Sequence, residues 1–186
     1  MLTLELHWHC LILPDGSSIT DSVANLTIQP GGSAVIESES LTTSINVGWA
    51  EVRASGFLGG YAIFRQRVAG MLDSEGTTQL ETVASSSIVF AYDNAAGFQT
   101  GVALANLSAD AATITAILRG EDGFFLGSVR FDMPGLGHSS FFLSSQFAAT
   151  ANRRGIIEFQ NSSGDITGIG LRFSPSLSFT SVPSVR

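Results

Sequence analysis

The stretch GIIEFQNSSGDITGIGLRF, residues 155–173, indicates the fold class of this chain. Apolar residues recur at every second position in both of its halves, which is the period of a β-strand and not that of a helix. The halves are separated by NSSG at 161–164, a cluster typical of turns. The stretch therefore predicts two short strands joined by a turn.

The same period recurs along much of the chain. Val102 and Leu104 alternate with alanines, and Ile114, Ala116 and Leu118 occupy every second position of a Thr-rich run. Such residues suit a half-buried pleated surface, and no long segment carries the apolar stripe of a helix. The chain is therefore predicted to be an all-β sandwich or barrel. Turn clusters separate the predicted strands: PDG at 14–16, PGG at 30–32, DN at 93–94, EDG at 121–123 and PG at 134–135.

Composition excludes several classes of partner. The chain has 186 residues, of which 44% are hydrophobic, enough for one large domain or two smaller ones. Its net charge is −7 and it contains no lysine, so it lacks the basic surface that binding to nucleic acid or to an anionic membrane requires. No apolar run approaches the ~18–20 residues of a membrane span, so membrane insertion is not expected. The single cysteine, Cys10, excludes an internal disulfide.

An internal repeat organises the sequence. Residues 48–65, GWAEVRASGFLGGYAIFR, align with residues 155–173 after one insertion, with glycines, a glutamate, a serine and the apolar positions in phase. Gly48 precedes Gly155 by the same number of residues as Asp15 precedes Asp122. Two distant anchors with one spacing indicate a duplicated unit.

The first copy lacks a counterpart of residues 88–109, which open the second copy. We therefore expect residues 1–84 to form an incomplete first β-sandwich repeat and residues 85–186 a complete second one, with the boundary in the polar stretch 73–87. An incomplete sandwich has an unpaired strand edge, which favours pairing with another segment. The candidates for that segment are residues 88–92, residues 178–182 or a neighbouring molecule.

Three stretches carry a resemblance to a known family. They are FAYDNAAGFQTGVALANLSADAATITAILRGEDG at 90–123, MPGLGHSSFFLSSQF at 133–147 and RGIIEFQNSSGDITGIGLRF at 154–173. Together they resemble an uncharacterised repeat domain of secreted bacterial surface proteins, well in the second copy and loosely in the first. Leu107 departs from the proline common after L-A-N in that family, and Tyr92 interrupts its usual Phe-Asp-Asn.

The resemblance implies tandem immunoglobulin-like β-sandwiches, the first lacking its opening strands, in a larger exported protein. It also implies an extracellular or cell-surface location and no catalytic residues. The first ten residues, MLTLELHWHC, lack the basic and apolar regions of a signal peptide, so the chain is expected to be a fragment or mature piece of a longer protein.

The sharpest local motif is HWHC at residues 7–10. A strand places His7 and His9 on one face, where they would supply half of a zinc or copper site. Such a site needs further ligands, and the only other histidine is His138, in the second copy. We therefore expect surface histidines on an edge strand and no bound metal, and Cys10 is expected to be a small buried apolar residue.

Other catalytic and metal-binding patterns are weak. The serines lack a G-x-S-x-G elbow. Glu51 and Glu158, which invite comparison with a glycosidase pair, occupy equivalent positions in the two copies and are expected to do the same structural task twice. The acidic turns at 15–16, 93–94 and 121–123 offer oxygen ligands for calcium, but turn chemistry already explains them. No cofactor is predicted.

Aromatic residues form the candidate contact surface. Because neighbouring residues of a strand face opposite ways, the pairs Phe124–Phe125 and Phe141–Phe142 are each expected to place one ring outward, either exposed or buried in the seam between the repeats. The candidate contact residues are Trp49, Phe57, Tyr61, Phe124 and Phe142.

These observations predict a non-enzymatic extracellular structural or adhesion module. One alternative is a carbohydrate-binding module that uses aromatics near Trp49 and Tyr61. A second alternative is a self-assembling subunit completed by strand exchange with a neighbour. The predicted partners are other protein chains at sheet edges, or glycans, and a homo-oligomer is one possible assembly.

Overall fold

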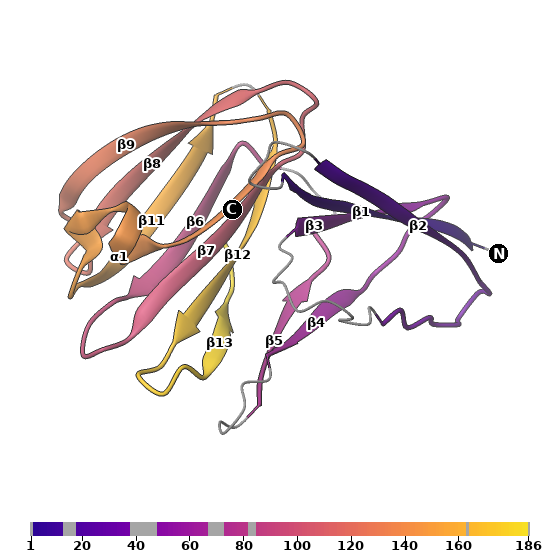
Figure 1. Cartoon of the computed structure of the whole chain (residues 1–186), viewed down its shortest axis with the longest axis horizontal. Helices are drawn as coiled ribbons and strands as arrows, with labels where there is room; N and C mark the ends of the chain where they lie inside the picture. Colours follow the sequence, from indigo (N-terminus) through magenta and orange to yellow (C-terminus); the bar gives the residue numbers. More distant parts are fainter. Residues whose placement is uncertain are drawn as a thin grey trace. The chain divides into compact units, whose positions relative to one another are not determined.

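The computed structural model describes residues 2–12, 18–37, 48–66, 73–81, 85–162 and 164–185 (Figure 1). For residues 8–12, 18–24 and 48 it describes the backbone alone. The chain divides into two compact units, Met1–Gly59 and Gly60–Arg186. The described residues are mostly in antiparallel strands, and the α-helix among them is α1, the four residues Leu143–Gln146. The prediction of an all-β protein is therefore confirmed.

The part of the first unit that the structure describes contains one antiparallel sheet of three strands. These are β1 (Leu2–Ile12), β2 (Ser18–Ile28) and β3 (Gly48–Ala54), in the order β2-β1-β3. Leu4 and Leu6 are buried on one face of β1, as the period of two predicts.

Among its described residues, the second unit contains three sheets. Two are four-stranded, with the orders β6-β11-β8-β9 and β10-β7-β12-β13, and the third is the hairpin β4-β5. The strands are β4 (Tyr61–Gln66), β5 (Ser74–Gln79), β6 (Ser87–Asp93), β7 (Gln99–Asn106), β8 (Ala112–Gly120), β9 (Phe125–Met133), β10 (His138–Phe142), β11 (Arg154–Asn161), β12 (Ile166–Phe173) and β13 (Phe179–Val182).

The two four-stranded sheets share one hydrophobic core and so form two layers. Phe90 on β6 and Phe159 on β11 are fully buried, with their ring centroids 6.4 Å apart and their planes steeply inclined. From the other sheet, Leu104 on β7 and Ile166 on β12 enter the same core. Sandwich-like packing of residues from both layers therefore holds residues 85–185 together.

Strand β12 alternates small and large residues, but its small residues face the core. Its glycines face the core: a Cβ at Gly168 would lie 2.8 Å from Leu104 Cδ2, and one at Gly170 would lie 3.1 Å from Phe90 Cδ1. Apart from Ile166, which enters the core, the larger apolar residues of β12, Ile169 among them, lie on the outer face and are half-buried. Small residues are required on the inner face because the large rings and leucines of other strands fill that space.

The polar stretch 73–87, expected to hold a boundary between repeats, contains strand β5. This strand has no large apolar residue, but its Gly76 is buried against the rings of Phe64 and Phe179, which stack at 5.6 Å. The glycine makes the close approach feasible, and cross-strand pairing with β4 supplies the backbone hydrogen bonds. The β4-β5 hairpin accordingly belongs to the second compact unit, although the sequence assigned it to the first repeat.

The expectation that residues 88–92 or 178–182 complete the first repeat is wrong for the described strands. Residues 88–92 lie in β6, which pairs with β11, and β13 pairs with β12. Residues 88–92 supply Ile88, Phe90 and Tyr92 to the core of the sandwich. Strand β13 is an edge strand beside β12, and its Phe179 stacks on Phe64 of β4 without strand pairing. Neither segment therefore pairs with β3 or β4.

Candidate functional site

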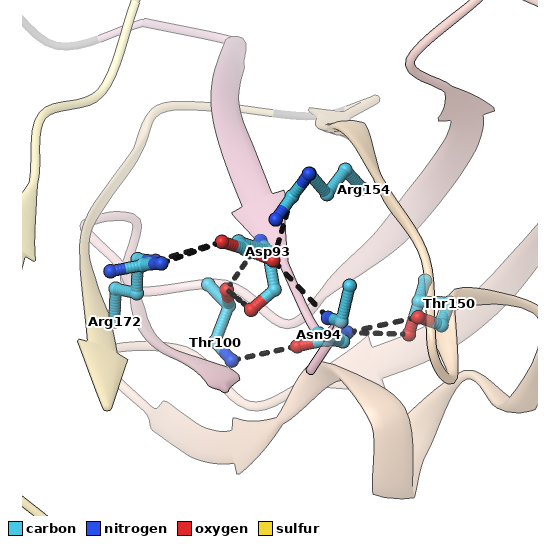
Figure 2. A network of polar contacts seen from close by, with 7 residues as sticks. Asp93, Asn94, Thr100, Thr150, Arg154 and Arg172 are labelled. Carbon is cyan, nitrogen blue, oxygen red and sulfur yellow. Dashed lines mark hydrogen bonds and ion pairs between the residues drawn. The ribbon is translucent and has the colours of Figure 1, made fainter. Parts of the chain in front are cut away.

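The densest cluster of polar contacts surrounds Asp93, at the end of β6 (Figure 2). Its Oδ2 accepts hydrogen bonds from Nη2 and Nε of Arg172 at 2.7 and 3.0 Å, and its Oδ1 accepts one from Nε of Arg154 at 3.1 Å. The Ala95 backbone N–H also donates to Oδ1, at 3.1 Å. One carboxylate thus joins the turn after β6 to the start of β11 and the end of β12.

These donors keep Asp93 ionised. Burial alone would raise the pKa of Asp93, but the hydrogen bonds from Arg172, Ala95 and Arg154 outweigh burial and hold the pKa below its ordinary value of 3.8. Arg172 is held in turn by the ring of Phe98, whose centroid lies 3.6 Å from the guanidinium carbon. Both oxygens of the carboxylate are therefore committed to arginines, and the arrangement differs from a calcium-ligand loop.

Asn94 continues the network into the interior (Figure 2). Its Oδ1 accepts the Thr100 backbone N–H at 2.7 Å, and its Nδ2 donates to both O and Oγ1 of Thr150 at 3.2 Å. Thr100 and Thr150 are fully buried. Because every one of these groups is out of water, each hydrogen bond replaces one that water would otherwise make.

A second buried amide lies at the opposite end of β7. Asn106 Nδ2 donates to the carbonyls of Asp110 and Pro134 at 2.9 and 3.0 Å, and its Oδ1 accepts the Ser108 N–H at 3.0 Å. A Cβ at Gly135 would collide with the Ala109 carbonyl, so this turn has room only for glycine. The L-A-N and P-G motifs of the sequence therefore meet in one structural joint.

The histidines take separate places. His7 Nε2 lies 3.3 Å from Oε2 of Glu5 on the same strand, and the side chains of His9 and Cys10 lie outside the described residues. His138 is on β10, opposite Ala105, and burial lowers its pKa. Within the described ranges no three potential metal ligands come together.

The equivalent glutamates both serve as polar groups on strands. Glu51 on β3 forms an ion pair with Arg53 at 3.1 Å. Glu158 on β11 accepts hydrogen bonds from Ser87 at 2.9 Å and Gln160 at 2.8 Å. Each carboxylate thus contacts neighbours on its own sheet.

A shallow hollow of about 260 Å³ lies at one end of the sandwich. Acidic residues from the β8–β9 turn and basic residues at the start of β11 line it together: Glu121, Asp122, Arg153 and Arg154, with Ala95, Gly120 and Asn152. Arg154 is tied to Asp93 and Asp122 Oδ1 accepts the Phe124 N–H, so part of the charge is already satisfied.

The five candidate contact aromatics are divided between the two compact units. Trp49 is half-buried on β3 and Phe57 is 96% exposed, both in the first unit, whereas Tyr61, Phe124 and Phe142 belong to the second. The candidate set therefore does not belong to a single compact unit.

The paired phenylalanines differ from each other. Phe141 turns into the core and Phe142 outward, 5.2 Å from the ring of Phe173, as expected for a strand. Phe124 and Phe125 are 73% and 60% exposed, because Phe124 lies in the turn and not in β9. The expected opposition of the two faces is therefore absent at this pair.

The sequence pointed to Asp93 and Asn94 as a turn and missed their partners. Arg172, Arg154 and Thr150 lie far from them in the chain, and a charged residue within a strand was the one available signal. No family model, curated protein or solved structure matches this chain. In the part of the chain that the structure describes, no helix is long and apolar enough to cross a membrane.

Proposed function

We propose that this chain is a non-enzymatic structural module, a spacer or adhesion element of an extracellular protein, built from two related β repeats. The observation that carries the proposal is that polar side chains of the D-N, L-A-N and L-R-F segments make structural hydrogen bonds. Four of these side chains make hydrogen bonds mainly to the backbone and to one another, and these bonds connect loops to strands: Asp93, Asn94, Asn106 and Arg172. Hydrogen bonds of this kind hold the fold together and leave these side chains few free groups for a ligand.

Strand order supports the duplication. The sheet β2-β1-β3 has the same sequence of antiparallel neighbours as β9-β8-β11, and the hairpin β4-β5 has the same pairing as β12-β13. The aligned segments 48–65 and 155–173 fall on β3-β4 and β11-β12. Strands β6 and β7 are then the opening strands that have no counterpart in the first repeat.

The proposed repeat is an immunoglobulin-like sandwich with two outer strands exchanged. Its pairs β7-β10 and β8-β11 correspond to the B–E and C–F pairs of an immunoglobulin domain, although β10 is here an edge strand. The first strand, β6, lies beside β11, and β12 lies beside β7, whereas an immunoglobulin domain places these two strands in the opposite sheets. The extracellular location rests on the family resemblance of the second repeat.

Stability measurements on motif variants test the proposal. Asp93→Ala, Asn106→Ala and Arg172→Ala should each lower the free energy of unfolding, whereas Asp132→Ala on an exposed strand is the matched control. Residues kept for binding or catalysis commonly cost stability, so their removal leaves a protein as stable or more stable. Motif variants as stable as the parent would overturn the structural role.

Two activity measurements complete that test. Assays with ester, glycoside and peptide substrates, with and without divalent metals, should show no turnover. Affinity electrophoresis through polysaccharide gels should show no retardation. Retardation that Tyr61→Ala or Trp49→Ala abolishes would instead support the carbohydrate-binding alternative.

A further inference from the structure

The outer edge of β4 offers both backbone and apolar groups to a partner. The Leu80 N–H donates to the Gly60 carbonyl at 2.9 Å, which fixes the alternation of the β4-β5 ladder. By that alternation Tyr61 and Ile63 turn their N–H and C=O groups away from β5. Their side chains are 69% and 55% exposed. Among the described strands only β5 pairs with β4.

The second repeat contains the same edge in a filled state. The sequence repeat matches Tyr61 with Ile169 and Ile63 with Leu171 on β12. The hydrogen bond from the Leu107 N–H to the Asp165 carbonyl, 3.1 Å, sets the β7-β12 ladder. Its alternation directs the backbone groups of Ile169 and Leu171 towards β7.

Strand β7 has the side chains that such an edge requires. Opposite Ile169 and Leu171 it places Ala103 and Gly101. These small residues leave room for the large side chains beside them; a Cβ at Gly101 would already lie 3.4 Å from the Phe173 ring. A strand beside β4 would likewise need small residues opposite Tyr61 and Ile63.

The donor strand must come from elsewhere than a folded copy of this chain. Strand β7 lies between β10 and β12, so a second copy would lose its own core by releasing it. A two-stranded sheet such as β4-β5 gains most from a third strand. An extended segment of another polypeptide with the small-residue pattern of β7 would fit this edge.

We propose that the β4 edge, Tyr61 and Ile63, binds an extended strand of the type QTGVALAN, with glycine or alanine at alternate positions, in antiparallel register. The inference rests on the repeat correspondence between β4 and β12 proposed above. The proposed module would then be joined to a partner protein through main-chain pairing at this edge.

Amide hydrogen exchange of the full chain with a synthetic peptide, FQTGVALANL, the sequence of residues 98–107, tests this. At a peptide concentration about ten times its Kd, the Tyr61 and Ile63 amides should exchange about tenfold more slowly. The Ala62 amide, which faces β5, should not change. Unchanged exchange at Tyr61 and Ile63 would overturn the proposal, whether or not the peptide binds elsewhere.

Variants locate the effect at the edge. Ile63→Pro removes an N–H that makes no bond to β5, so the hairpin should persist while the protection by peptide is lost. Ile63→Lys should weaken peptide binding at least about tenfold without the constraint of proline. Thr77→Lys adds the same charge opposite Ile63 on the neighbouring strand and is the matched control. Equal peptide binding by Ile63→Lys and the parent would contradict the assignment.

Two further outcomes are decisive. A peptide with valine in place of Gly101 and Ala103 should bind at least about tenfold more weakly, because bulky residues crowd Tyr61 and Ile63; equal binding would contradict the proposed pattern. If light scattering without peptide shows a dimer that Ile63→Pro dissociates, the occupant is a second copy and the proposal fails. Neither result changes the stabilities of the motif variants, so this proposal and the structural role fail separately.

Discussion

Strands β12 and β4 share a pattern of residues but have different neighbours. In β12, Ile169 and Leu171 are half-buried and face a paired strand, whereas Tyr61 and Ile63 in β4 are largely exposed at an edge. The alternation of residues makes each segment a strand, but it does not decide whether the strand lies inside a sheet. The place of a strand in a sheet depends on whether another strand lies beside it. Strand β7 lies beside β12, whereas no described strand takes the corresponding place beside β4.

Core substitutions should show the largest difference in stability between β11, in the sandwich, and β3, in the first compact unit. Phe159→Ala, in the fully buried position on β11, should lower the free energy of unfolding by about 3–5 kcal/mol. Val52→Ala, at the matching position of β3, removes a half-buried group and should cost about 1 kcal/mol. Chemical denaturation followed by circular dichroism measures both. Equal costs would show that β3 is packed as tightly as β11.

Tryptophan fluorescence adds an independent measure. Trp8 and Trp49, the two tryptophans, lie in the first compact unit, so their emission follows that unit. Phe159→Ala should shift the circular dichroism transition more than the fluorescence transition. A common shift in both signals would show that the two units unfold as one.

Removal of the buried Asn94 amide should have the next largest effect on the free energy of unfolding. Asn94→Ala leaves the Thr100 N–H and the Thr150 hydroxyl and carbonyl without this partner in the interior, which should cost about 2–3 kcal/mol. Gln160→Ala removes an exposed amide and should cost less than about 0.5 kcal/mol. Thermal and urea unfolding of the two variants compares them. An Asn94→Ala cost no larger than the control would remove the structural role of the network.

The ion pairs of Asp93 should make the stability of the sandwich depend on pH in the acid range. The folded-state pKa of Asp93 is lowered, so its contribution to stability is complete above the ordinary value of 3.8 and is lost as pH falls through the lower folded value. Asp93→Asn should therefore flatten the loss of stability below about pH 4. Unfolding measured from pH 7 to pH 2 would show this; an unchanged acid profile would contradict the prediction.

The corresponding change in the β4-β5 hairpin should have a smaller effect on stability. Glu75 pairs with Arg65 at 2.8 Å across β4-β5, but both side chains are about half exposed. An exposed pair contributes little because water screens it. Glu75→Gln should therefore leave the acid profile close to that of the parent, and a profile as flat as that of Asp93→Asn would show that this pair is equally important.

Surface charge should give the smallest difference. Leu171→Lys buries part of a charged side chain on β12 and should cost about 1 kcal/mol or more. Ile63→Lys, on the exposed edge of β4, should stay within about 0.5 kcal/mol of the parent. Thermal unfolding of the pair ranks them. A larger cost at Ile63 would show that this edge is covered within the chain.

Much of the sandwich formed by residues 85–185 could be predicted from period and turn chemistry. The alternation at Ile114, Ala116 and Leu118 identified a buried face correctly, and the EDG and PG clusters are turns. Alternation failed at β12 because both of its faces are at least partly covered, so the large residues no longer mark the core side. It also missed β5, where pairing and one close glycine contact replace hydrophobicity.

The polar network was less predictable for a physical reason. Asp93 and Arg172 meet only after two strands from different sheets reach the same end of the sandwich, and nothing local in the sequence pairs them. In the sequence the buried Asn94 resembles any turn asparagine, because its partner Thr150 lies far away in the chain and contacts it only in the folded protein. Contacts that depend on topology require the fold first.

Native-state amide exchange of the unliganded chain tests most directly whether β4 is the uncovered counterpart of β12. If it is, the Ile169 and Leu171 amides should exchange only through opening of the sandwich, whereas those of Tyr61 and Ile63 should exchange at nearly the rate of an unstructured peptide. Comparable slow exchange at all four amides would contradict this correspondence.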